Sequence, residues 1–457
     1  MATQTTSSTS RGRWEPLQLP ANGQGFVGAA GNAFESRDPV TGEVVATLRS
    51  STPLDLDSAI ERAQRAFRTS RWASDGALRA QVLHGYARAL TENSERLAEL
   101  LTREQGKTIH EARIELGGSA RMVDYYAGLA RAVYGRSAVL GPEVTGVVLR
   151  EPVGVVAVIT PWNWPLTLLV RSLAPALAAG NAAVVKPASL TSAVTVEALA
   201  LLAAQPDLPD GILGCVLGSG AVVGDALVGH DGVEMIAFTG ETRTGIHVMK
   251  RAAEGLRKVA LELGGKAPNV VFADSNLEKA LAGAENAIFT TCGQICTAGS
   301  RLLVEDGIFD EFVERLAANG DGLRIGDGLD PSTQLGPVAS ADQRDKIAEY
   351  VERGKREGTL VGGGAPLEGN GYDEGFFVSP AIFTDLPADS TLIREEIFGP
   401  VLTVQRFADE DEAIALANQT EYGLAAGLWT QNLDRAWRVG RAIRAGTVWI
   451  NTYHHFY

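Results

Sequence analysis

The chain has 457 residues, of which 45% are hydrophobic and 21% are charged, a composition typical of globular proteins and unlike that of disordered or fibrous ones. Its length exceeds what one hydrophobic core usually organises, so we expect two or three structural domains. The 55 acidic residues outnumber the 41 basic ones and give a net charge of −14, which argues against nucleic acid or an anionic membrane as a partner.

Cysteine and histidine are sparse. The three cysteines, Cys215, Cys292 and Cys296, give no disulfide framework and no four-cysteine zinc site, and they suit a reducing compartment. The six histidines lack the spacing of metal ligands, so we expect no metal site. The amino terminus is polar where a signal peptide has an apolar core, and no apolar run is long enough to cross a bilayer. We therefore predict a cytoplasmic protein without a membrane partner.

The first part of the chain is predicted to be helical, after an irregular stretch over residues 1 to about 30. Apolar residues recur at helical spacing in residues 54–70, behind aspartates suited to a helix start. Longer helices are expected over about 77–105 and 107–129, although two consecutive glycines weaken the second. Residues 132–152 are expected to form a protruding hairpin.

From about residue 147 short β-branched runs alternate with Ala/Leu-rich helical stretches. This alternation predicts an α/β fold, in which parallel sheets carry helices on both faces and bind ligands at the carboxyl ends of strands. We expect two such domains with a cleft between them, and surface loops around one helix at 340–357. The predicted strands are 154–160, 181–187, 214–218 and 233–240 in the first set, and 269–274, 301–306, 400–407, 423–430 and 447–451 in the second.

Four residues stand out at or near the ends of predicted strands. Asn163 lies in a rigid segment rich in Trp and Pro, where its amide could stabilise an oxyanion or simply complete a polar turn. Lys186 could meet ribose or phosphate oxygens, or be solvated. Glu262 lies in an apolar strand, where a carboxylate is either paired or raised in pKa and able to act as a base. Cys296 lies among glycines and small residues, as a nucleophile or as a small buried residue.

Taken together, these four residues and the segment Glu-Glu-Ile-Phe-Gly-Pro at 395–400 resemble the motif set of the aldehyde dehydrogenase superfamily, in order and in neighbours. The separations of 34 residues from Glu262 to Cys296 and 99 from Asn163 to Glu262 match the usual pattern of the family. The resemblance runs from about residue 37 to residue 452.

The resemblance implies two Rossmann-like α/β domains and a small protruding β-hairpin for oligomerisation. A discontinuous cofactor-binding domain would comprise residues 1–133 and 147–262, and the hairpin residues 134–146. The catalytic domain would comprise residues 263–446. Residues 447–457 would begin a carboxyl-terminal segment that is truncated here, because family members continue into a strand added to a partner subunit. A homodimer or homotetramer is implied, with contacts weakened by the missing strand.

For the chemistry, the resemblance implies that Cys296 attacks an aldehyde and that Asn163 and the backbone N–H of Cys296 stabilise the oxyanion. Glu262 would then activate the water that releases the carboxylic acid. The cofactor would be NAD or NADP. Its binding residues would be Ile159, Thr160, Trp162, Lys186, Ser189, Gly220, Gly240, Glu241, Gly245, Leu263, Glu396 and Phe398.

Two departures from the family pattern bear on the cofactor. Ser189 stands where NAD-preferring members often carry Glu, and it would not repel a 2′-phosphate. We therefore predict NAD use with tolerance of NADP, or even preference for it. Glu241 stands where many members carry Ser, which puts its phosphate contact in doubt.

The resemblance implies a small aldehyde as the substrate, and Trp164, Leu168, Arg171 and Phe456 fall where family members line the substrate tunnel. Arg171 occurs in members that oxidise semialdehydes and in some that oxidise aromatic aldehydes, and the second arginine of the semialdehyde group is Thr290 here. We expect a hydrophobic or aromatic aldehyde. The alternatives are a semialdehyde dehydrogenase for a carboxylate-bearing aldehyde, a CoA-acylating enzyme, which Glu262 disfavours, and a non-catalytic member that serves as a binding or structural protein.

Overall fold

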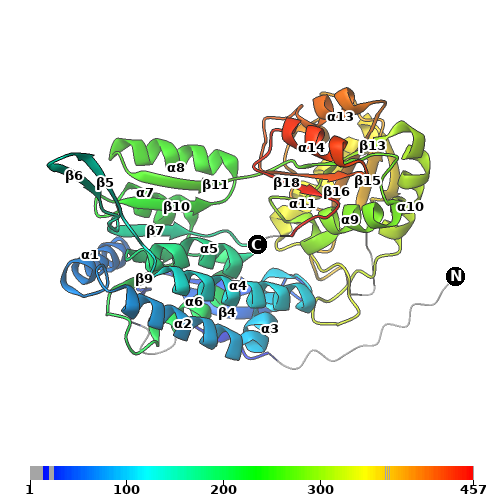
Figure 1. The fold of residues 1–457 in the computed structure, drawn as a ribbon. Helices are drawn as coiled ribbons and strands as arrows, with labels where there is room; N and C mark the ends of the chain where they lie inside the picture. Colours follow the sequence, from blue (N-terminus) through cyan, green and yellow to red (C-terminus); the bar gives the residue numbers. More distant parts are fainter. Residues whose placement is uncertain (1–13, 20–24, 366, 368, 370, 456–457) are drawn as a thin grey trace.

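The computed structural model describes residues 14–19, 25–365, 367, 369 and 371–455, which form two α/β lobes (Figure 1). The first lobe is built on a fully parallel sheet with the strand order β11-β10-β7-β8-β9-β2. Its inner strands are buried along their length, as expected where helices cover both faces of a sheet. The strands are β2 (Val27–Gly28), β7 (Val155–Ile159), β8 (Ala182–Lys186), β9 (Leu213–Val216), β10 (Met235–Thr239) and β11 (Lys258–Glu262).

The second lobe contains a sheet with the order β14-β15-β16-β13-β12-β17-β18, in which only the β14–β15 pair is antiparallel. These two sheets confirm the predicted α/β fold class. The strands are β12 (Pro268–Val271), β13 (Arg301–Glu305), β14 (Thr359–Gly363), β15 (Ala381–Thr384), β16 (Val401–Phe407), β17 (Ala425–Trp429) and β18 (Thr447–Ile450). A small sheet, β1-β4-β3, packs on the first lobe and contains β1 (Leu17–Gln18), β3 (Ala33–Arg37) and β4 (Val44–Arg49).

Helices cover the sheets of both lobes (Figure 1). Those of the first lobe are α1 (Pro53–Thr69), α2 (Gly76–Glu92), α3 (Ser94–Gln105), α4 (Ile109–Leu129), α5 (Pro165–Ala178), α6 (Ser192–Ala203), α7 (Asp225–Gly229) and α8 (Thr242–Glu254). Those of the second are α9 (Leu277–Phe289), α10 (Phe309–Asp321), α11 (Ala341–Glu357), α12 (Thr391–Arg394), α13 (Glu410–Ala417) and α14 (Leu433–Ala442).

The single helix predicted over 77–105 is wrong, because the structure divides it at Asn93 into α2 and α3. The Asn93 backbone leaves helical geometry at φ −102° and ψ 9°. Its side-chain amide donates to the carbonyl oxygen of Ala89 at 2.9 Å. Asparagine side chains compete in this way with the backbone for carbonyl acceptors, which favours a break. The glycines at 117 and 118, by contrast, lie inside an unbroken α4.

Each lobe has its own hydrophobic core. One large cluster spans Leu19 to Ala252, and two smaller clusters draw their buried residues from Ala267 to Tyr453. The lobes are joined where β11 passes through the short segment 263–267 into β12. Contacts near this junction, from the Gly265 N–H to Glu396 and from Asn163 to the Gln294 carbonyl, bring the carboxyl edge of the first sheet close to the amino edge of the second.

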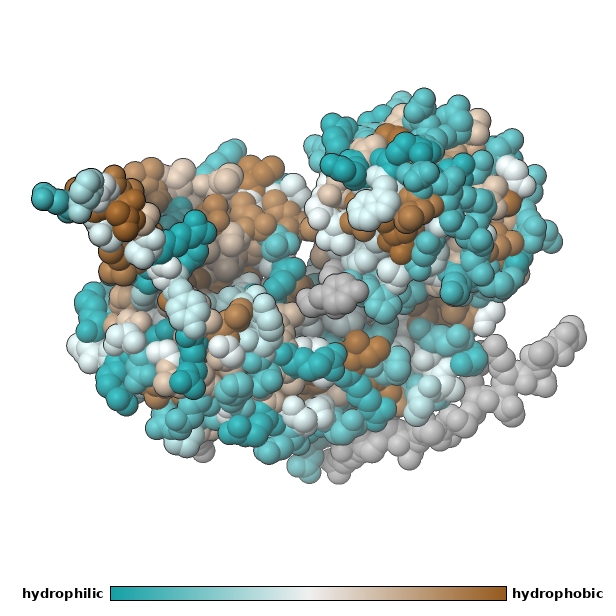
Figure 2. Space-filling model, viewed as in Figure 1, coloured by the Kyte–Doolittle hydropathy of each residue, from teal (hydrophilic) through white to brown (hydrophobic). Residues whose placement is uncertain are grey.

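This arrangement gathers the ends of several strands at one place. At the carboxyl edge of the first sheet, Ile159 is paired with Lys186, and Thr239 is paired with Glu262. At the facing edge of the second sheet, β12 and β13 begin in register, and the first residue of β13, Arg301, pairs with Thr403 of β16. The surface is hollowed between the lobes (Figure 2). Ligands of open α/β sheets bind outside the carboxyl ends of the strands. We therefore expect a ligand-binding site in this cleft.

A two-stranded hairpin projects from the first lobe and consists of β5 (Arg136–Gly141) and β6 (Val144–Val148). It carries exposed apolar side chains, among them Val139 and Leu140, which are 81% and 70% exposed, and its surface is correspondingly brown in Figure 2. Within the described part of the chain, no helix combines the length and apolar character needed to cross a membrane.

Candidate active site

Cys296 lies in the loop between α9 and β13, at the amino edge of the second sheet. It is partly exposed, whereas Cys215 and Cys292 are buried. The backbone before Cys296 is not helical, because Thr291 and Cys292 adopt left-handed conformations with φ of 50° and 55°. A side chain at Gly265 would collide with the carbonyl oxygen of Cys296, so only glycine lets the 263–267 segment pass this close to the loop.

Asn163 meets this loop from the first lobe. It is buried, and its side-chain amide donates to the carbonyl oxygen of Gln294 at 2.9 Å. Gln294 is itself fixed, since its side chain donates to the Thr291 carbonyl at 3.0 Å and accepts from the Ala339 N–H at 3.0 Å. An asparagine amide has two N–H donors. One holds Asn163 to the cysteine loop, and an amide of this kind has a second N–H that can serve another acceptor.

Glu262 differs from the sequence expectation, because its side chain is 49% exposed rather than buried in an apolar strand. The reason is that β11 is an edge strand whose residues alternate between exposed and half-buried. Its carboxylate lies 3.7 Å from the guanidinium of Arg171 on α5, which also donates to the Thr239 hydroxyl at 3.2 Å. The carboxylate is therefore accessible to water and adjacent to a cation.

The ionisation of Cys296 is set by opposing effects. Burial raises the pKa of the thiol to about 11, and the charges of Glu396 and Glu262 also raise it. The Arg171 cation and the backbone N–H of Cys296 lower the same pKa. Because the thiolate is the nucleophilic form of cysteine, Arg171 is the side chain that favours the reactive state of Cys296.

Lys186 is the last residue of β8 and is buried. The alternative that it is a solvated lysine is therefore wrong. Its amine donates to the Pro187 carbonyl at 3.0 Å, and burial lowers its pKa to about 8. Thr160, which follows Ile159 at the end of β7, is buried and bonds through its backbone N–H to the Lys186 carbonyl. Ser189 donates to the Gly218 carbonyl at 3.1 Å. These residues form a continuous line along the carboxyl edge of the first sheet.

Glycines border this line. At Gly220 a side chain would meet open space, and at Gly245 it would collide with Leu263. The N–H of Gly240 bonds to the carbonyl oxygen of Glu262 at 3.0 Å. Glu241 precedes α8 without a capping bond, and its side chain is 61% exposed beside Arg243. The structure therefore places Glu241 in solvent.

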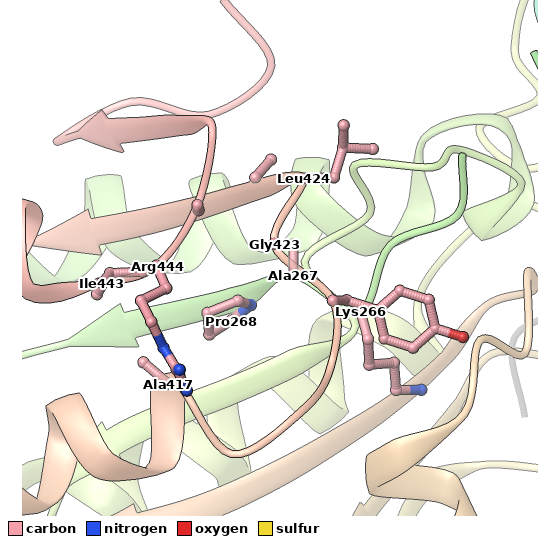
Figure 3. Close-up of a pocket in the computed structure, with 11 residues that line it drawn as sticks. Lys266, Ala267, Pro268, Ala417, Gly423, Leu424, Ile443 and Arg444 are labelled. Atoms are coloured by element: carbon pink, nitrogen blue, oxygen red, sulfur yellow. The ribbon is translucent and has the colours of Figure 1, made fainter. Parts of the chain in front are cut away.

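Glu396 comes from the second lobe, in the segment between α12 and β16. Its carboxylate accepts from the Gly265 N–H at 3.0 Å. Burial raises the pKa of Glu396, whereas the cations Lys346 and Lys266 lower it. Lys266 is itself buried beside a small pocket with Pro268 and Leu424 (Figure 3), and burial lowers its pKa to about 7. The pocket contains none of the three catalytic candidates, so we do not treat it as the substrate site.

Aromatic side chains lie near the cleft. The rings of Trp162 and Phe398 meet edge to face at 5.4 Å and join the two lobes. Trp164 packs on the buried Lys107 amine at 4.0 Å, and Leu168 is buried on α5. The fourth predicted lining residue, Phe456, lies outside the described residues. Within the described part of the chain, no group of His, Cys, Asp or Glu is arranged to hold a metal ion.

Sequence reasoning missed a set of supporting polar residues. Glu111 bonds to the cysteine loop, and Glu115, paired with Lys107, bonds to the start of α5. The spacing of Thr108 and Glu111 is that of a capping box, which could have placed a helix start there. The contacts with the rest of the site had no local signal.

Comparison with known proteins shows which proteins this chain is similar to. The model of the aldehyde dehydrogenase family matches residues 26–457. The betaine aldehyde dehydrogenase of Bacillus subtilis is 41% identical over 424 residues, which are 92% of this chain and 86% of that protein. An aldehyde dehydrogenase of Emericella nidulans is 38% identical over 441 residues, which are 96% of this chain and 88% of that one.

Among solved structures, the betaine aldehyde dehydrogenase of Staphylococcus aureus in complex with NAD+ superposes with a TM-score of 0.91 at 36% identity. The superposition covers 93% of this chain and 85% of the other.

The charges around Cys296 predict how its reaction with an alkylating reagent depends on pH and on Arg171. Because the thiolate fraction grows about tenfold per pH unit below the pKa, iodoacetamide should alkylate Cys296 ever faster from pH 7 to pH 10. Arg171→Met should slow the reaction roughly tenfold at pH 8, since loss of a neighbouring cation raises a thiol pKa. Arg171→Lys should restore it, and Arg243→Met should have no effect. Peptide mass spectrometry assigns the site, and a plateau in rate near pH 8 would contradict this picture.

Proposed function

The chain belongs to the aldehyde dehydrogenase family, and we propose that it oxidises an aldehyde to the carboxylic acid through a covalent bond to Cys296, with NAD as the hydride acceptor. One observation carries this proposal: the bond from Asn163 to Gln294 joins a buried amide of one lobe to the partly exposed cysteine loop of the other. A nucleophile and an oxyanion donor are thereby held in one cleft.

In the first half of the reaction, the Cys296 sulfur adds to the aldehyde carbon and negative charge moves to the carbonyl oxygen. Asn163 and the backbone N–H of Cys296 stabilise this oxyanion, which exists only after the bond has formed, so they favour the transition state over the bound substrate. The cofactor, when bound, accepts the hydride from the same carbon. Cys296 is left as a thioester.

In the second half, Glu262 removes a proton from water, whose oxygen attacks the thioester carbonyl. The carbon–sulfur bond breaks, the acid leaves, and Cys296 is regenerated as a thiolate. An exposed base is suited to this step because bulk water reaches it directly. Arg171, 3.7 Å from the carboxylate, orients Glu262 for this step.

The carboxyl edge of the first sheet fits a dinucleotide. Within the described part of the chain, the buried Lys186 amine donates one hydrogen bond, to the adjacent Pro187 carbonyl, which leaves ammonium donors for ribose or phosphate oxygens. We propose that Lys186 and Ser189 hold one ribose and that Glu396 and Phe398 hold the other. Gly220, Gly240 and Gly245 would admit the phosphates close to the backbone, with Ile159, Thr160, Trp162 and Leu263 around them. Glu241, exposed beside Arg243, would face solvent.

Ser189 decides the tolerance for NADP in this proposal. Introducing a carboxylate with Ser189→Glu should lower kcat/KM for NADP at least tenfold relative to NAD, since like charges in contact cost several kcal/mol. Ser189→Ala, which stays neutral, should leave the ratio within about twofold of wild type. Steady-state kinetics with both cofactors measures the ratio, and an already exclusive use of NAD by the wild-type enzyme would show that Ser189 does not admit the 2′-phosphate.

For the substrate we propose a hydrophobic or aromatic aldehyde. The support comes from α5, where Trp164 and Leu168 offer apolar surface, and from Arg171, whose guanidinium is engaged by Glu262 and Thr239. A second cation for a carboxylate-bearing substrate is not supplied at Thr290, which bonds to Asn286.

A panel of benzaldehyde, hexanal, betaine aldehyde and succinic semialdehyde, with and without CoA, tests reaction and substrate together. We expect benzaldehyde and hexanal to exceed succinic semialdehyde at least tenfold in kcat/KM, without a requirement for CoA. Cys296→Ala should abolish turnover. Glu262→Gln should keep a first burst of reduced cofactor but slow steady turnover about 100-fold, the scale of a lost general base. Faster turnover of succinic semialdehyde would reverse the substrate proposal, and no turnover of any aldehyde would favour a non-catalytic binding protein.

The hairpin supports a homodimer or homotetramer. Contiguous exposed apolar side chains on a projecting element usually mark an interaction surface, and Val139 and Leu140 lie on this one. Light scattering should give a mass of two or four chains, and the double substitution Val139→Asp and Leu140→Asp should shift it towards one. A monomeric wild-type protein would refute this assembly.

A further inference from the structure

The turn that precedes Cys296 is strained. Thr291 and Cys292 are consecutive non-glycine residues with φ of 50° and 55°, and Gly293 follows at 70°. Left-handed backbone geometry is unfavourable for L-residues other than glycine. Such a turn persists only where surrounding contacts hold it.

A contact from the other lobe holds this turn. The Glu111 carboxylate, on the first turn of α4, accepts from the Thr291 N–H at 2.5 Å and lies 3.5 Å from the Thr291 hydroxyl. Its charge also raises the pKa of the Cys292 thiol, which places Glu111 beside both strained residues. The partners are 180 residues apart in the chain.

The Glu111 carboxylate is also held by hydrogen bonds within its own helix start. Its second oxygen accepts from the backbone N–H and the hydroxyl of Thr108 at 2.8 and 3.0 Å. The N–H of Glu111 bonds back to the Thr108 hydroxyl at 3.3 Å, which completes a capping box. One oxygen of Glu111 therefore closes the start of α4, and the other is aimed at Thr291.

From Thr291 the bonds continue to the oxyanion donor. The Thr291 carbonyl accepts from the Gln294 side chain, and the Gln294 carbonyl accepts from Asn163. One turn further along α4, Glu115 accepts from the N–H groups of Leu166 and Thr167, just after Asn163, at 2.8 and 3.1 Å. Two carboxylates on one helix thus support the cysteine loop and the asparagine segment.

We propose that Glu111 is a positioning residue: its bond to Thr291 fixes the strained turn and thereby sets the position of Cys296 relative to Asn163. The catalytic consequence of this position rests on the proposed function. The bond from Glu111 to Thr291 can be tested without measuring catalysis.

The chain supplies a matched pair of variants. In α1 the same capping box is made by Thr52 with Asp55, so an aspartate is long enough to close a helix start. Glu111→Asp should therefore keep the cap of α4 but withdraw the carboxylate from Thr291 by one methylene. Thr108→Val should do the opposite, since it removes half of the cap and leaves Glu111 opposite Thr291.

Hydrogen–deuterium exchange of the peptide covering residues 288–298 reads out the turn directly. We expect faster uptake in Glu111→Asp and wild-type uptake in Thr108→Val. In turnover, Glu111→Asp should lower kcat at least tenfold, because displacements of about 1 Å at a nucleophile can cost up to 100-fold. The KM for NAD should stay within about twofold, since Glu111 lies apart from the proposed cofactor residues. Thr108→Val should lower the melting temperature but leave kcat within about twofold.

Equal uptake in the two variants, or equal losses of kcat, would show that Glu111 acts only as a helix cap and would overturn the proposal. If the wild-type protein oxidised no aldehyde, the proposed function would fail, but the contrast in deuterium uptake would still decide whether Glu111 holds the turn.

Discussion

The geometry of the whole site depends on the segment 263–267, which carries the chain from β11 in one sheet into β12 in the other. Because of it, the carboxyl edge of one parallel sheet faces the amino edge of the other. Two positions of this segment have no room for a side chain: at Gly264 it would collide with the Glu396 carboxylate, and at Gly265 with the Cys296 carbonyl. These two glycines therefore allow Glu262, Cys296 and Glu396 to lie around one stretch of backbone.

Burial then decides the resting charge of the groups brought together there. It raises the pKa of Cys296 and of Glu396 and lowers that of Lys186, so each is shifted towards its neutral form. Glu262 lies instead on the edge strand β11, where its side chain is 49% exposed. The site thus combines a buried thiol, the proposed nucleophile, with a water-accessible carboxylate, the proposed base, and the Arg171 cation lowers the pKa of the thiol. Perturbed groups of this kind are common at functional sites.

The sequence predicted the parts of this site that depend on local pattern and missed those that depend on strand order or distant contacts. Asn163 and Lys186 follow short apolar runs, and their places at strand ends could be read directly. Glu262 could not be judged buried or exposed, because that depends on whether β11 is an inner or an edge strand. The break at Asn93 depends on a single side-chain bond within a strongly helical region. The contact of Glu111 with Thr291 joins residues whose local patterns carry no information about each other.

The two lobes have separate hydrophobic cores, so apolar packing alone does not fix how they meet. The cleft is crossed instead by directional contacts: Asn163 to Gln294, Glu111 to Thr291, and the edge-to-face rings of Trp162 and Phe398. A single hydrogen bond contributes only about 0.5–1.5 kcal/mol net, far less than either core, but its energy depends strongly on geometry. Stability therefore resides within the lobes, whereas the relative position of nucleophile and oxyanion donor resides in a few polar contacts between them. Substitutions at these contacts can disturb the chemistry without unfolding either lobe.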